Sequence, residues 1–173
     1  MLTAAGFAFN ALAPDIDESP RASETPQNYV ERLAVEKAMA IARVRPDALV
    51  IGADTTVVVD GLALAKPLDA NDAKAMLGLL NGRAHDVLTG VAIVGPAGTR
   101  SGVERTRVWF NPMTSGDIDE YVASGEPMGK AGAYGIQGLA SRYIPRIEGS
   151  YTNVVGLPVA LVVRLMADLQ FEA

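Results

Sequence analysis

Two β-rich stretches on either side of a short turn restrict the fold of this chain more than any other feature. Residues 87–94 and 103–110 are rich in β-forming side chains, and Gly-Pro-Ala-Gly occupies positions 95–98 between them. Such runs around a glycine- and proline-containing turn predict a long antiparallel hairpin. The chain is therefore expected to contain a β-sheet.

Helical patterns stand before, between and after the predicted strands. Apolar residues recur at helical spacing from Pro26 to about Arg45, where Pro46-Asp47 ends the pattern. The order of helices and strands lacks strict βαβ repetition, and it predicts an α/β protein with a mixed sheet. The other expected helices begin at Asp69 or Asn71, at Asp117 and at Pro158, and further strands are expected at 48–53, 57–59, 62–64 and 143–147.

Composition removes several classes of protein. The 173 residues suit one domain or two small lobes sharing a core, and the absence of Cys excludes disulfides, Cys-based metal sites and thiolate catalysis. A net charge of −5 argues against a broad nucleic-acid surface. The N-terminus lacks the basic region of a secretory signal, and no apolar run is long enough to cross a membrane. We therefore expect a cytoplasmic protein with neither a nucleic-acid polymer nor a membrane as partner.

Asp54 is the most suggestive single residue. It follows the apolar run 48–53, so we expect it at the end of a strand. The carboxyl ends of strands form the ligand crevice of many α/β proteins, where Asp54 could bind a metal or activate water. The alternative is an aspartate that caps a turn through its own backbone.

Other charged residues allow two interpretations each. Lys37 lies on the apolar side of the first helix, where it needs a partner or must extend to solvent. Lys66, next to Pro67, suits a phosphate oxygen or is an exposed solubilising lysine. Glu18 could bind a hard cation or belong to a solvated acidic loop.

The glycine-rich segment 129–138 carries the remaining candidates. Its glycines allow a backbone to approach a ligand closely, and the amide of Gln137 could read the edge of a base. A tight structural turn is the alternative, and Lys130 is an equally open case. His85 is interpreted as a structural hydrogen-bonding residue. These residues together are compatible with a metal-assisted reaction on a nucleotide phosphate.

Taken in order, the motifs of this chain resemble the Maf family of house-cleaning nucleoside triphosphate pyrophosphatases. The resemblance extends from about Ala5 to Leu169. It is carried by Ala53-Asp54-Thr55, Lys66-Pro67, Met76-Leu77 to Gly82, His85 to Val91, Gly125-Glu126-Pro127, Lys130 to Gly138 and Gly149 to Pro158.

The resemblance implies a hydrolase of nucleotide metabolism that converts a nucleoside triphosphate to the monophosphate and pyrophosphate with Mg²⁺ or Mn²⁺. It implies an α/β fold with a mixed, twisted sheet, flanking helices and two lobes around a cleft, and it allows a homodimer. By the same resemblance, Asp54 activates water near the metal, Glu18 is the second acidic ligand, and Lys37 and Lys66 contact phosphates. Thr55 and Gln137 match positions tied to base choice, and Lys130 is placed with the substrate-binding residues.

The forms Ile-Gln-Gly at 136–138 and Gly-Ser-Tyr-Thr-Asn-Val-Val at 149–155 resemble the branch that acts on dTTP and UTP. The branch that acts on 7-methyl-GTP usually has Glu near Gln137. The alternative function is a catalytically impaired nucleotide-binding protein that regulates septum formation during cell division. Retention of the candidate site residues argues against that alternative; these are Glu18, Lys37, Asp54, Lys66 and Gln137.

Three departures from the family pattern stand out. The pattern begins with a strand and a Ser-Pro-Arg-Arg loop that contacts the triphosphate, whereas Ala4-Ala5-Gly6-Phe7 corresponds to the stretch after that loop. Ala65 replaces a glycine before Lys66, and Gly129 replaces an acid before Lys130. We therefore expect residues 1–173 to form one Maf-like domain that lacks its N-terminal segment, and to have weak activity or none toward dTTP compared with a chain extended by that segment.

Overall fold

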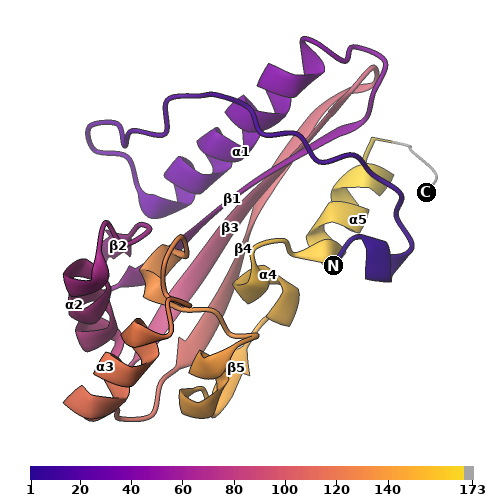
Figure 1. Cartoon of the computed structure of the whole chain (residues 1–173). Coiled ribbons are helices and arrows are strands. Elements are labelled where there is room, and N and C mark those ends of the chain that lie inside the picture. Colours follow the sequence, from indigo (N-terminus) through magenta and orange to yellow (C-terminus); the bar gives the residue numbers. More distant parts are fainter. Residues whose placement is uncertain (170–173) are drawn as a thin grey trace. The chain divides into compact units, whose positions relative to one another are not determined.

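The computed structural model describes residues 1–169, which form an α/β fold (Figure 1). This confirms the expected class. The helices are α1 (Pro26–Ala42), α2 (Ala70–Leu80), α3 (Ser115–Ala123), α4 (Tyr151–Val155) and α5 (Val159–Ala167), and short 3-10 helices span Thr3–Ala5, Ala131–Ala133 and Leu139–Tyr143. The strands are β1 (Val50–Val59), β2 (Leu62–Leu64), β3 (Ala84–Gly95), β4 (Gly98–Trp109) and β5 (Arg146–Glu148).

The five strands lie in the order β2-β1-β3-β4-β5 and run antiparallel. This refines the expected mixed sheet to an antiparallel one. The hairpin predicted from the sequence is formed by β3 and β4, and β2 returns along β1 with Val57 opposite Leu64. The last strand pairs with β4 through Val108 and Ile147.

The chain forms two compact units. Unit 1 contains residues 1–55, 89–104 and the part of the chain from 156 onward, and unit 2 contains 56–88 and 105–155. The strands β1, β3 and β4 each contribute residues to both units.

In unit 1, helices α1 and α5 cover opposite faces of the strands. Because side chains alternate along a strand, Val91 and Ile93 of β3 pack with α5, whereas Ala92 and Val94 pack with α1. The backbone of α1 lies very close to the sheet: a Cβ atom on Gly90 would lie 2.2 Å from the carbonyl oxygen of Val30. Glycine at this position therefore sets the distance between α1 and the sheet.

The core of unit 2 is formed by apolar side chains of α2 and α3 against the strands. Leu77 and Leu80 of α2 are fully buried there, together with Val87 and Val108 of the sheet. Asp69 caps α2 by accepting a hydrogen bond from the backbone N–H of Asp72. Of the two caps that the sequence allowed, Asp69 and Asn71, the structure has the first. Phe110 packs edge-on against the rings of His85 and Tyr134. These contacts build a rigid base for the glycine-rich segment that follows α3.

Two predictions about local structure are wrong. Helix α1 ends at Ala42 instead of continuing to about Arg45, because Pro46 has no N–H to donate to the carbonyl of Ala42 and the helical hydrogen bonding stops there. Asp54 lies inside β1, not at the end of a strand. The polar run 54–56 continues the strand because each of its side chains has a partner: Asp54 pairs with Lys37, Thr55 lies within hydrogen-bonding distance of Thr89, and Thr56 donates to the carbonyl of Leu64. Helix α4 and the three 3-10 helices were not predicted.

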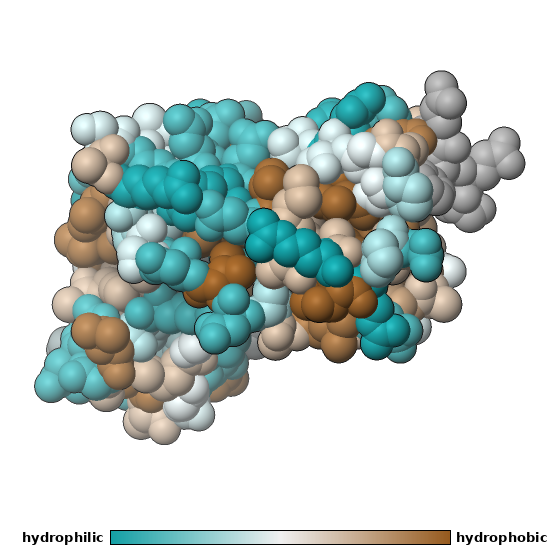
Figure 2. All heavy atoms as spheres, turned by 90° about the horizontal axis from the view of Figure 1, so that it is seen from above, coloured by the Kyte–Doolittle hydropathy of each residue, from teal (hydrophilic) through white to brown (hydrophobic). Residues whose placement is uncertain are grey.

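Hydrophobic side chains reach the surface in separate patches between hydrophilic ones on the face shown in Figure 2. Individual apolar residues are strongly exposed, above all Leu68 at 90% and Val44 at 68%. Scattered exposure of this kind is ordinary for globular proteins. Among residues 1–169, none of the helices combines the length and apolar character needed to cross a membrane.

Candidate active site

The centre of the candidate site is a lysine held between two carboxylates in unit 1. Nζ of Lys37 lies 2.6 Å from Oδ1 of Asp54 and 2.7 Å from Oε1 of Glu18. The side chains of Lys37 and Asp54 are 20% and 13% exposed, whereas Glu18 is 49% exposed. The structure thus brings together three residues that the sequence analysis selected separately.

The position of each residue follows from the element that carries it. Thr25 caps α1 through its side chain, and Pro26 occupies the first turn. Lys37 is three positions after Ala34 and one before Ala38, both of which pack on the sheet, so its side chain points toward β1. Glu18 comes from the irregular segment before the helix. A helix, a strand and a loop therefore supply one group each.

Electrostatics keep Lys37 charged. Burial by itself would lower the pKa of Lys37, but hydrogen bonds to Asp54 and Glu18 outweigh that effect and raise its pKa above the usual value. The cluster thus combines one ammonium group with two carboxylates. This arrangement attracts a further cation and can also orient a phosphate oxygen through the ammonium group.

The carboxylates fit a hard divalent cation. Their oxygens both lie within 2.7 Å of one ammonium nitrogen, so they converge on a single point. Within residues 1–169, no three His, Asp or Glu side chains cluster as ligands, so the protein would supply two ligands here. Mg²⁺ commonly uses one or two carboxylates and completes its octahedral shell with water and phosphate oxygens.

Thr55 faces the opposite side of β1 from Asp54, because neighbouring strand residues alternate. Its Oγ1 lies 2.9 Å from Oγ1 of Thr89 in β3, within hydrogen-bonding distance. Thr55 therefore belongs to unit 1 but does not join the Lys37 cluster. The resemblance implied a role for Thr55 in base choice, and the structure gives it the buried hydroxyl of Thr89 as a partner.

Three further candidates, Lys66, Lys130 and Gln137, belong to unit 2 and are exposed. The ammonium group of Lys130 donates a hydrogen bond to the backbone carbonyl of Glu126. Gln137 lines a surface pocket of about 480 Å³. The other residues that line it are Ile136, Ser141, Ile144, Pro145, Arg146, Ile147 and Tyr151.

The turn that carries Gln137 is held at both ends by a pair of residues that the sequence analysis did not select. The hydroxyl of Tyr121 accepts a hydrogen bond from Gly135 N and donates one to Oε1 of Glu126. Oε2 of Glu126 accepts from the backbone N–H of Leu139. Gln137 thus projects from a turn fixed on both sides. Glu126 belongs to the Gly-Glu-Pro motif, and that motif was the sequence signal that could have identified it.

His85 has the structural role predicted for it. Its Nε2 lies 2.8 Å from the hydroxyl of Tyr134, and its side chain is buried. Burial lowers the pKa of His85 to about 4, so the ring is neutral at pH 7.

Comparison with known proteins identifies the family of this chain. Residues 1–169 match the family described as Maf-like protein. Proteins named dTTP/UTP pyrophosphatase are similar: one from Shewanella denitrificans is 51% identical over 96% of this chain and 86% of its own length. Others from Vibrio parahaemolyticus and Pelotomaculum thermopropionicum are 49% and 47% identical over 92% and 99% of this chain, and over 85% and 91% of their own lengths. The chain belongs to the Maf family.

Proposed function

We propose that this protein is a pyrophosphatase that hydrolyses dTTP, UTP and related or modified pyrimidine nucleoside triphosphates to the monophosphate and pyrophosphate. The observation that carries the proposal is the ammonium group of Lys37 between the carboxylates of Asp54 and Glu18. Support for the substrate comes from relatives named dTTP/UTP pyrophosphatase at 45–51% identity.

In the proposed reaction, water attacks phosphorus and the anhydride bond between the α- and β-phosphates breaks. Asp54 orients the water and accepts its proton, while Lys37 neutralises charge on a phosphate oxygen. Glu18 and Asp54 would hold Mg²⁺ or Mn²⁺, which when bound supplies further neutralisation of phosphate charge. Lys66 is assigned a second phosphate contact by its position in the Lys-Pro motif.

Base choice is assigned to Thr55 and Gln137, and Lys130 is assigned to substrate binding. The side-chain amide of Gln137 offers one acceptor and two donors, which can match the carbonyl and N–H groups of uracil and thymine. Its pocket combines apolar isoleucines with Ser141 and Arg146, a lining that suits a planar heterocycle. The pocket and the fixed turn support the role proposed for Gln137.

The test is release of pyrophosphate from dTTP, UTP and 7-methyl-GTP in the presence of Mg²⁺ or Mn²⁺, with Asp54→Asn as the matched variant. We expect release from dTTP and UTP, dependence on the cation, and a fall of kcat by about 10²-fold or more in the variant, since it removes a general base. Nucleotide binding without release by the unaltered chain would favour the alternative, an impaired nucleotide-binding protein with a role in cell division. Faster release from 7-methyl-GTP would overturn the assigned substrate class.

We also propose that the protein acts in the cytoplasm, and the resemblance to the family allows a homodimer. Light scattering coupled to size-exclusion chromatography measures the oligomeric state directly, because a dimer would have twice the 18.1 kDa mass of the chain.

A further inference from the structure

Glu18 lies in residues 17–24, here called the acidic segment. This segment forms neither helix nor strand, and its one regular feature is a turn at residues 22 and 23. A segment of this kind gains little order from its own backbone. Glu18 nevertheless reaches Lys37 at 2.7 Å. Contacts outside the segment must therefore hold it against α1.

The main contact is made by Arg32 of α1. Its Nε and Nη2 donate to the two carboxylate oxygens of Glu24 at 2.6 and 2.8 Å, and Nη2 also donates to the carbonyl of Ser19 at 3.2 Å. The side chains of Arg32 and Glu24 are only 12% and 9% exposed. A paired, two-point bond with little solvent access is much stronger than an ordinary surface ion pair.

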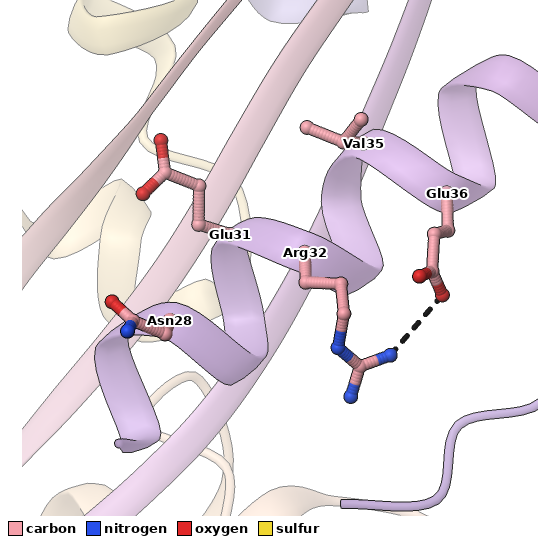
Figure 3. Close-up of a pocket in the computed structure, with 5 residues that line it drawn as sticks. All are labelled: Asn28, Glu31, Arg32, Val35 and Glu36. Atoms are coloured by element: carbon pink, nitrogen blue, oxygen red, sulfur yellow. Dashed lines mark hydrogen bonds and ion pairs between the residues drawn. The ribbon is translucent and has the colours of Figure 1, made fainter. Parts of the chain in front are cut away.

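Glu36 fixes the guanidinium group from the other side. Nη1 of Arg32 donates to Oε2 of Glu36 one turn further along α1, and both residues line a surface pocket of about 340 Å³ (Figure 3). Oε1 of Glu36 accepts from Nη2 of Arg21 in the acidic segment. The arginine therefore has one orientation, set by its own helix and directed at the segment.

Tyr29 makes the contact nearest to the site. Its hydroxyl donates to the backbone carbonyl of Glu18 at 2.9 Å, and its ring lies 5.5 Å from the guanidinium carbon of Arg32. Together, Tyr29 and Arg32 hold the carbonyls of Glu18 and the next residue, Ser19. These bonds fix the backbone from which the side chain of Glu18 reaches Lys37.

We propose that Arg32 and Tyr29 are positioning residues, which act through the acidic segment to hold the Glu18 carboxylate beside Asp54 for a divalent cation. The proposal rests on the proposed function, in which Glu18 and Asp54 are the cation ligands. Groups that orient a metal ligand typically contribute 10- to 100-fold to metal affinity. A ligand on an irregular segment depends on such groups more than one on a helix or strand.

The test compares Tyr29→Phe and Arg32→Gln with the unaltered chain. The matched control is Tyr143→Phe, which removes a hydroxyl that donates to Asp117, away from the acidic segment in the sequence and in unit 2. The first measurement is Mn²⁺ affinity by electron paramagnetic resonance without nucleotide, at a temperature where each variant is fully folded. The second is the rate of trypsin cleavage after Arg21, which reports how firmly the segment is held.

We expect Mn²⁺ affinity to fall about tenfold or more in Arg32→Gln and by a smaller factor in Tyr29→Phe, with no change in the control. Cleavage after Arg21 should accelerate in the same order. Unchanged Mn²⁺ affinity in folded Tyr29→Phe and Arg32→Gln overturns the proposal, even if thermal stability falls, because that pattern indicates a purely structural role. An unaltered chain that binds no Mn²⁺ also overturns it, whereas the proposed reaction is judged separately by pyrophosphate release.

Discussion

Nζ of Lys37 and Oδ1 of Asp54 lie 2.6 Å apart, although 17 positions of sequence separate the two residues. The contact joins the helix that packs on the sheet to the strand beneath it. Because Lys37 also bonds Glu18, one ammonium group compensates two carboxylates.

Replacing Lys37 with Gln should leave Asp54 and Glu18 facing one another without their shared cation. We expect kcat/KM for dTTP to fall by about 10²-fold, the usual cost of removing a charge-stabilising donor. The variant should also gain more thermal stability from added Mn²⁺ than the unaltered chain, because the metal replaces the missing ammonium. Equal Mn²⁺ stabilisation of the two proteins would contradict this account.

Gly90→Ala should destabilise the protein strongly. The new Cβ would lie 2.2 Å from the carbonyl oxygen of Val30 and 2.7 Å from the backbone nitrogen of Glu31, and backbone atoms of a helix cannot move aside cheaply. We expect a loss of about 3 kcal/mol in the free energy of unfolding, measured by urea denaturation.

Gly78→Ala is the matched control for that substitution. Gly78 lies within α2, and a Cβ atom there would meet no heavy atom within 4 Å. The control should raise the free energy of unfolding by up to about 1 kcal/mol, because alanine favours helix more than glycine does. Similar losses for both variants would argue against the close approach of α1 to β3.

Stability should depend on pH through His85. Its folded pKa is about 4, below the usual 6.5, because burial disfavours the charged ring. Above pH 6.5 the ring is neutral in both states; as the pH falls from 6.5 to 4, only the unfolded chain gains a proton. The free energy of unfolding should therefore decline across this window, by at most about 1.4 kcal/mol per pH unit from this residue.

Carboxylates also titrate near pH 4, so the measurement is the difference between the unaltered chain and His85→Gln in urea denaturation at each pH. The variant should lose less stability between pH 6.5 and 4. Parallel pH profiles for the two proteins would mean that His85 is not buried in its neutral form.

Gln137→Ala should change substrate binding more than turnover. Loss of hydrogen bonds worth about 1.5 kcal/mol predicts roughly a tenfold rise in KM for dTTP with little change in kcat. Selectivity for dTTP over dCTP should narrow as well, since the amide no longer distinguishes the two base edges. Gln27→Ala, at an exposed position of α1, is the control and should leave both constants unaltered. A fall confined to kcat would assign Gln137 a role in the chemical step.

The sequence by itself determined several local features of this protein, above all its turns and helix starts. Residues 95–98 specify the β3–β4 turn, and Asp60-Gly61 specifies the return of β2, because turn geometry depends on a few neighbouring residues. Asp69 before α2 and Pro26 at the start of α1 acted as helix signals for the same reason. The chemical types proposed for the candidate site were also legible as carboxylates, lysines and a glutamine.

Only the tertiary structure decided which of these groups meet. The apolar run before Asp54 indicated a strand end, but the strand continues because Lys37 compensates the carboxylate from a different element. Arg32 gave no signal in the sequence, since its partners Ser19 and Glu24 lie 13 and 8 positions away in an irregular segment. Propensity and turn chemistry act between neighbours, whereas a partially buried charge is stabilised only by groups that folding brings to it.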